Sequence, residues 1–173
     1  KGRATKGKII GRQLSYHGSS FGTMSVAGNT ARRRLYSPLV MPFPLVPAPH
    51  CYRCFYQLSY PSCKVRCATV LEQVILAEGP DNIAAFIAEP IIGTSAGASV
   101  PPKEYFPLIR EICDKYEVLF IADEVMSGYG RSGKFTAMEH FGVKPDIFTL
   151  GKGIAGGYTP LAAVVASEEV HRV

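Results

Sequence analysis

The chain has 173 residues, of which 47% are hydrophobic, and a formal net charge of +5 at pH 7. This length and composition allow one α/β domain with a sizeable core and exclude two large domains. The basic residues are spread along the chain, and no aromatic residues interleave with the run Arg32-Arg33-Arg34, which argues against a nucleic-acid-binding protein. We interpret that run as a solvated or phosphate-facing turn.

Membrane association and secretion are not favoured by the sequence. No stretch approaches eighteen uninterrupted apolar residues, and no signal-type apolar region follows the basic N-terminal residues. We therefore expect a soluble, cytoplasmic protein that does not contact a membrane.

The two ends of the chain lie close to predicted strands. Strand-like sequence begins near the N-terminus, and the last apolar run stops shortly before Val173. We expect the chain to be a fragment, so that parts of any active site lie outside it.

The first predicted strand covers residues 8–12 and leads into an aromatic ring, an imidazole and flexible glycines. Tyr16, His17 and Gly18 stand at its carboxyl end. A flat cofactor ring needs an aromatic residue over it, and Tyr16 is a candidate for that position. An aromatic residue after a strand more often belongs to the core, so this motif alone does not decide between the two.

Residues 38–67 form a Pro- and Cys-rich excursion in which we expect little regular structure, because prolines break helices and strands. Its cysteines have the spacing Cys51-x2-Cys54 and Cys63-x3-Cys67. Four thiols could bind zinc and organise an interaction module, but the short loop and the second spacing depart from the common zinc ribbons. Disulfides are not expected in a cytoplasmic chain. We favour free thiols and no metal site.

Helices and strands alternate after the excursion. Apolar residues at helical spacing predict a first helix around residues 70–75, ended by Gly79-Pro80, and a second around residues 106–116. Short apolar strands follow each helix, at residues 84–88 and 118–122, and two more are predicted at residues 147–150 and 161–165. Continuous apolar strands between helices indicate an α/β fold with a mostly parallel sheet and helices on both faces.

Three of these strands are followed by a functional side chain, namely Glu89, Asp123 and Lys152. Ligands of open α/β sheets bind beyond the carboxyl ends of the strands, so we expect these three residues to converge. An amine and an acid in this arrangement suit pyridoxal 5'-phosphate (PLP) chemistry. The amine bonds covalently to the cofactor, and the acid keeps the pyridine nitrogen protonated.

Each of these residues also has a plainer interpretation. Lys152 could be a surface lysine, although its flanking glycines indicate close backbone approach, and a buried preceding strand favours a partly desolvated lysine. Asp123 could pair with Arg131, although an acid after five apolar residues requires a cationic partner that a pyridinium would supply. Glu89, which precedes a proline, could pair locally. Glu124 is expected to have a structural role.

The run Gly128-Tyr129-Gly130-Arg131-Ser132-Gly133 fits the glycine spacing of a dinucleotide-binding loop. That loop should open a helix directly after a strand, with an acid about twenty residues later. Here residues 123–127 intervene, no acid stands at that distance, and the next helix is expected near Phe135. We therefore do not favour dinucleotide binding.

Taken together, these motifs resemble the class III PLP-dependent aminotransferases of fold-type I. The resemblance covers nearly the whole chain and is most specific from Leu119 to Gly133 and on to Lys152. It implies that Lys152 forms the Schiff base with PLP and moves the proton, and that Asp123 binds the pyridine nitrogen. The other residues that it places at the cofactor are Val125 under the ring, Tyr16 over it, and His17 and Glu89 beside it.

The resemblance implies a transaminase that moves an amino group from an amino acid or amine donor to a keto acid, and a homodimer in the full-length protein. Residues 1–173 would form part of the large PLP-binding domain, with residues 38–67 as an excursion from it. Residues 91–97 depart from some family branches, which argues against an ornithine-type site. Met126 replaces a glutamine that some relatives use toward the cofactor's ring oxygen. The phosphate-binding loop and the arginine that binds the substrate carboxylate are expected outside this chain, so the chain alone should be inactive. The alternative within the family is an aminomutase or amine lyase.

Overall fold

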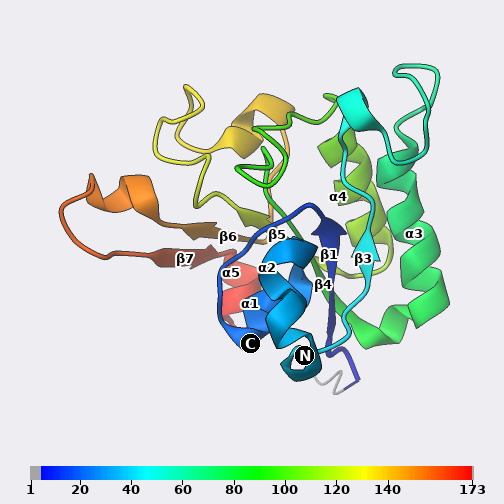
Figure 1. Cartoon of the computed structure of the whole chain (residues 1–173), viewed down its shortest axis with the longest axis horizontal. Coiled ribbons are helices and arrows are strands. Elements are labelled where there is room, and N and C mark those ends of the chain that lie inside the picture. The colour runs from blue at the N-terminus through cyan, green and yellow to red at the C-terminus, as the bar shows by residue number, and fades with distance from the viewer. Residues whose placement is uncertain (1–4, 173) are drawn as a thin grey trace.

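The structure, a computed structural model, describes residues 5–172. These residues form a seven-stranded sheet with helices packed against it (Figure 1). The strands are β1 (Lys8–Gln13), β2 (Ala27–Gly28), β3 (Leu45–Val46), β4 (Ile83–Ala88), β5 (Leu119–Asp123), β6 (Ile147–Leu150) and β7 (Ala163–Ala166). The α-helices are α1 (Phe21–Val26), α2 (Thr30–Arg33), α3 (Arg66–Glu78), α4 (Tyr105–Lys115) and α5 (Glu168–His171). Short 3-10 helices cover Arg34–Leu39, Cys51–Arg53, Pro80–Asn82, Ala137–Phe141 and Lys152–Ala155.

The sheet is mostly parallel, as the sequence predicts. Its strand order is β2-β1-β4-β5-β6-β7, with β3 also paired to β1. Only β7 runs antiparallel, against β6, among the strands that the structure describes. The carboxyl ends of β1, β4, β5 and β6 therefore lie at the same edge of the sheet, and the expected ligand site lies at that edge.

The core lies between one face of the sheet and the pair α3 and α4, which run side by side (Figure 1). Both helices match the predicted apolar periodicity. The buried face of α3 consists of Ala68, Leu71 and Ile75, and that of α4 of Tyr105, Phe106, Ile109, Ile112 and Cys113. Gly79 ends α3 with a φ of 84°, and its N–H donates to the carbonyl of Leu76, so the predicted stop at this glycine is confirmed.

The two faces of the sheet are buried to different degrees. Phe86 and Phe120, which pair across β4 and β5, are fully buried under α3 and α4. Ile87 and Ile121, the next pair along, point to the opposite face because side chains alternate along a strand, and they are only half-buried. The helix α1 packs beside β1 away from the α3–α4 pair (Figure 1), and its buried residues lie outside that main core cluster.

The excursion at residues 38–67 is irregular over most of its length. The exception is β3, which adds two residues in parallel to β1 and was not expected from the proline-rich sequence. Pro44 and Pro47 flank this strand, so the prolines limit β3 to two residues. None of the helices in the described part of the chain has the length and apolar character to cross a membrane.

Candidate active site

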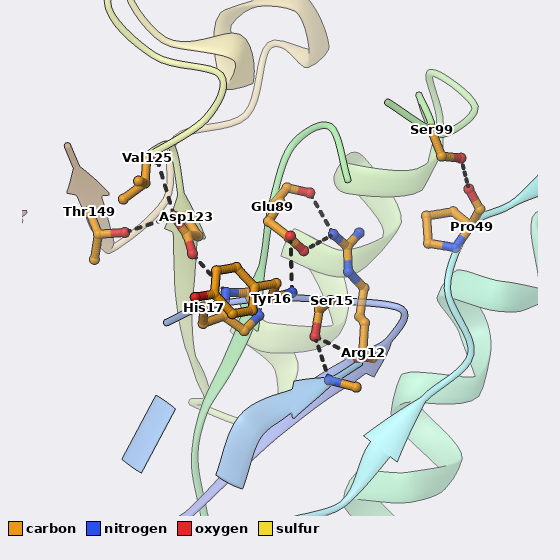
Figure 2. Close-up of polar contacts among 11 residues, drawn as sticks. Arg12, Ser15, Tyr16, His17, Pro49, Glu89, Ser99, Asp123, Val125 and Thr149 are labelled. Atoms are coloured by element: carbon orange, nitrogen blue, oxygen red, sulfur yellow. Dashed lines mark hydrogen bonds and ion pairs between the residues drawn. The ribbon is translucent and has the colours of Figure 1, made fainter. Parts of the chain in front are cut away.

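The buried centre of the site is a carboxylate held by an imidazole. Asp123 ends β5 and is only 6% exposed. Its Oδ2 lies 2.7 Å from Nδ1 of His17, and its Oδ1 accepts from the Val125 N–H (3.1 Å) and from the Thr149 hydroxyl (3.2 Å) (Figure 2). The structure thus pairs Asp123 with His17 and not with Arg131.

Burial alone would raise the pKa of Asp123. The hydrogen bond and charge of His17, the Val125 N–H and the Thr149 hydroxyl outweigh burial and hold the pKa below its ordinary value. Asp123 is therefore ionised at neutral pH, and its Oδ2 accepts a hydrogen bond from the N–H at His17 Nδ1. The other ring nitrogen of His17, Nε2, is buried and has no hydrogen-bond partner among residues 5–172.

A second buried acid connects the end of β4 to the end of β1. Glu89 is 4% exposed, and its Oε1 accepts from the backbone N–H of Tyr16 at 3.2 Å. Arg12, which is fully buried, donates from Nη2 to the Glu89 carbonyl at 2.6 Å and lies 3.5 Å from the Glu89 Oε2 (Figure 2). Glu89 therefore positions the backbone of Tyr16 and neutralises a buried guanidinium.

Removing the positive charge beneath Glu89 should destabilise the protein. We expect Arg12→Met to cost roughly 3–5 kcal/mol, because it leaves a carboxylate buried without its cation. The double variant Arg12→Met/Glu89→Gln should recover part of that loss, since the amide carries no charge. Thermal and denaturant unfolding of the full-length protein without cofactor measures both effects.

The matched control for this pair is Lys115→Met, which removes an exposed cation paired with Glu72 at 2.6 Å. An exposed pair of this kind contributes about 1 kcal/mol or less. Equal, small losses from Arg12→Met and Lys115→Met would contradict the assigned role of Arg12.

Lys152 follows β6 and begins a 3-10 turn. Its φ of 44° places a non-glycine residue in the left-handed region, at a cost on the order of 1–3 kcal/mol. A Cβ on Gly151 would come within 3.2 Å of the Val125 side chain, and one on Gly153 within 3.0 Å of Tyr129. The close approach predicted from the flanking glycines is thus to these two side chains. The expectation of a partly desolvated lysine is wrong for this structure, because Lys152 is exposed.

Tyr16 is covered by a cation. The Arg32 guanidinium lies 4.4 Å from the centroid of its ring, and the Tyr16 hydroxyl is 3.0 Å from the Ser19 hydroxyl. The hydrogen bond with Ser19 contributes most to lowering the pKa of Tyr16, burial opposes it, and the nearby positive charges of Arg32 and Lys152 lower it further.

One cavity of about 380 Å³ joins these groups. The six residues that the sequence placed at the cofactor all line it: Tyr16, His17, Glu89, Asp123, Val125 and Lys152. Its other lining residues, which sequence reasoning did not assign to the site, are Gly18, Arg32, Gly93, Thr94, Ser95 and Met126.

Two further residues of the site were not found from the sequence. Thr149 pairs in register with Asp123 across β5 and β6. A threonine hydroxyl on the strand beside the acid was the feature of the sequence that could have indicated this contact. Arg12 interrupts the first strand with a charge, a sign that a buried partner exists.

Two other sequence motifs have structural roles. The glycine run 128–133 lies in a turn, and the helix expected near Phe135 is a short 3-10 segment, Ala137–Phe141. This geometry does not fit a dinucleotide-binding loop, which opens an α-helix.

Glu124 is 1% exposed and accepts from the Ser127 hydroxyl (2.6 Å) and the Met138 N–H (2.9 Å), so its predicted structural role is confirmed.

The cysteines of the excursion gather around one small cavity of about 20 Å³, lined by Cys51, Cys54, Cys63 and Cys67. All are free thiols, and no three His, Cys, Asp or Glu side chains within residues 5–172 could hold a metal ion. Burial, together with the neighbouring thiols, raises the pKa of Cys67 to about 12, which opposes the thiolate that zinc requires. The zinc-module alternative therefore gains no support from the geometry.

Comparisons with known proteins identify the family of the chain. The family model Aminotransferase class-III matches residues 1–173. The chain belongs to the class III aminotransferases. Among curated proteins, it is 40% identical over 170 residues to the uncharacterized aminotransferase YodT of Bacillus subtilis (strain 168), covering 98% of the chain and 38% of that protein. It is 43% identical over 165 residues to the taurine–pyruvate aminotransferase of Bilophila wadsworthia, covering 94% of the chain and 35% of that protein.

Solved transaminase structures show the same fold. The omega transaminase of Pseudomonas jessenii in complex with PMP superposes with a TM-score of 0.91 at 40% sequence identity, covering 99% of this chain and 38% of the other. A transaminase obtained by ancestral reconstruction matches with a TM-score of 0.92 at 40% identity, covering 99% and 37%. The α/β fold class expected from the sequence is confirmed. The chain spans little more than a third of the length of these relatives.

Proposed function

We propose that the full-length protein containing this chain is a PLP-dependent transaminase that moves an amino group from an amino acid or amine donor to a keto acid. The observation that carries the proposal is one cavity with the buried Asp123–His17 pair at its floor and Lys152 at its exposed end. The names of the relatives and of the PMP complex support the same chemistry.

The Asp123 carboxylate fits the pyridine nitrogen of PLP. An ionised carboxylate has about four acceptor positions. His17, Val125 and Thr149 supply three donors, so one position is left for a ring N–H. When bound, PLP supplies an electron-withdrawing ring with a carbonyl that condenses with amines. Asp123 would hold the proton on the ring nitrogen, and His17 would keep Asp123 ionised and oriented.

Of the remaining residues, Lys152 would take part in the reaction, and the others would hold the cofactor in place. Lys152 Nζ would hold the cofactor covalently and then carry the proton at the substrate carbon that bears the amino group. Val125, fixed by the close Gly151 backbone, would support the ring from one side, and Tyr16 would cover the other. Glu89 would act through the Tyr16 N–H to keep that aromatic ring in place.

The proposal also covers the domain, the oligomeric state, the location and the partners of the enzyme. Residues 1–173 would be most of the large domain, with residues 38–67 as an excursion, and the protein would be a homodimer. Large exposed apolar side chains such as Leu35 (80% exposed) and Tyr52 (89% exposed) support a subunit interface. Free cysteines throughout the described residues support a cytoplasmic location. Small-molecule donors and acceptors are the proposed partners, and nucleic acid and membranes are not.

The test is the dependence of turnover on an acceptor. The full-length protein loaded with PLP should convert an amino donor catalytically only when pyruvate or 2-oxoglutarate is present, and one amino acid should form for each donor consumed. Without acceptor, it should convert about one donor per active site and stop. Continued release of ammonia or a rearranged amine without acceptor would contradict a transaminase and favour an amine lyase or aminomutase.

A further inference from the structure

The side chains at the floor of the active-site cavity are buried, and the cationic side chains at its rim are exposed. At the floor, Asp123 is 6% exposed and the His17 side chain is 1% exposed. At the rim, two cationic side chains, Lys152 and Arg32, are exposed to solvent. Lys152 has a role in the proposed reaction. Arg32 is the second cation of the cavity, and that reaction does not use it.

The fold fixes Arg32 at this rim. The helix α2 begins after Asn29, whose side chain accepts from the backbone N–H of Arg32 at 3.3 Å. The Arg32 guanidinium then lies over the Tyr16 ring, with 4.4 Å from its central carbon to the ring centroid. Stacking on an aromatic face restrains a guanidinium while leaving the N–H groups at its edge available. No acidic side chain within residues 5–172 forms a salt bridge with Arg32.

The other arginines of the run Arg32-Arg33-Arg34 do not share this position. Arg33 is committed to the fold, because its Nη1 donates to the Ala27 carbonyl at 2.9 Å. Arg34 is exposed and does not line the cavity. The run that the sequence suggested to be a solvated or phosphate-facing turn therefore contains one arginine that faces the candidate active site.

We propose that Arg32 binds the acid group, a carboxylate or a sulfonate, of the donor whose amino group bonds to the cofactor and releases Lys152 from it. This inference rests on the proposed transaminase function and adds a substrate class to it. A guanidinium fork pairs with two oxygens of such a group. The site then selects amines that carry an acid over amines of the same length that do not.

The test compares 4-aminobutyrate with 1-aminobutane in the full-length enzyme loaded with PLP. Each donor is mixed with the enzyme without acceptor, and the single-turnover change in cofactor absorbance gives kcat/KM for that half-reaction. Arg32→Met keeps most of the side-chain length over Tyr16 and removes the charge. We expect it to lower the preference for the acid-bearing donor by about tenfold or more, as loss of a charge-assisted hydrogen bond predicts. Arg32→Lys should retain part of the preference.

The matched control is Arg34→Met, two positions along the same run, which should leave the preference unchanged. A binding readout independent of turnover is the dissociation constant of glutarate, followed by cofactor absorbance, which should rise by a similar factor in Arg32→Met. Equal preferences in Arg32→Met and Arg34→Met would overturn the proposal. The proposal would also be overturned if Arg32→Met bound PLP more weakly and kept its preference for the acid-bearing donor, because Arg32 would then bind the cofactor phosphate. If the unsubstituted enzyme shows no half-reaction with any amine, the transaminase proposal itself fails.

Discussion

Lys152→Ala in the full-length protein is expected to abolish covalent attachment of PLP and to lower the rate of amino transfer by at least about 10²- to 10⁴-fold. The variant removes the amine that holds the cofactor and the group that carries the proton at the substrate carbon. Alanine leaves no amine at the position after β6 where Lys152 lines the cavity. Borohydride reduction followed by mass measurement, together with single-turnover kinetics, checks both effects.

The control for this change is Lys134→Ala. Lys134 lies beside the turn at residues 128–133 and does not line the cavity that holds Asp123. It should keep the reduced adduct and the full rate. Lys152→Ala with an undiminished adduct would contradict the assignment of Lys152, whatever its effect on the rate.

Asp123→Asn is expected to lower the rate of amino transfer on the order of 10²- to 10³-fold while preserving the shape of the site. The amide is nearly isosteric and can still accept from Val125 and Thr149, but it carries no charge to hold a proton on the pyridine nitrogen. His17 also loses its ionised partner at 2.7 Å. Single-turnover kinetics and the absorbance spectrum of the bound cofactor measure the change.

The pH dependence of the Asp123 effect follows from its lowered pKa. A carboxylate whose pKa is lower in the folded protein contributes stability above its ordinary value of about 4, and this contribution is lost as the pH falls through the lowered value. The difference in unfolding free energy between the native protein and Asp123→Asn should therefore be constant near neutral pH and shrink only in acid. Asp114→Asn, at an exposed carboxylate paired with Arg110, is the control, and it should leave the cofactor spectrum unchanged.

The helices and strands that could be predicted are those with a strong apolar period. In α4, burial of Phe106, Ile109 and Cys113 reproduces the spacing from which the helix was predicted. The strands β4 and β5 were recognised because both are continuous apolar runs. By contrast, β3 has two residues between prolines, and its pairing with β1 depends on a contact across the fold that no local pattern encodes.

The residues of the candidate site that could be predicted are those at the carboxyl ends of parallel strands. Glu89, Asp123 and Lys152 each stand at or just beyond the carboxyl end of a parallel strand, and such ends converge, so the topology predicts that the three residues share one cavity. The partners of these residues were not predictable, because hydrogen bonds between His17 and Asp123, or between Arg12 and Glu89, join segments more than seventy residues apart. The exposure of Lys152 was also missed, since a buried strand does not fix the burial of the turn that follows it.

The central claim is that Lys152 is the residue that holds PLP, and mapping the attachment site tests it most directly. The unmodified full-length protein is loaded with PLP, reduced with borohydride, digested and analysed by mass spectrometry. We expect one added pyridoxyl phosphate group per chain, on the peptide that contains Lys152 and at that lysine. A modified lysine elsewhere, with Lys152 unmodified, would contradict the account.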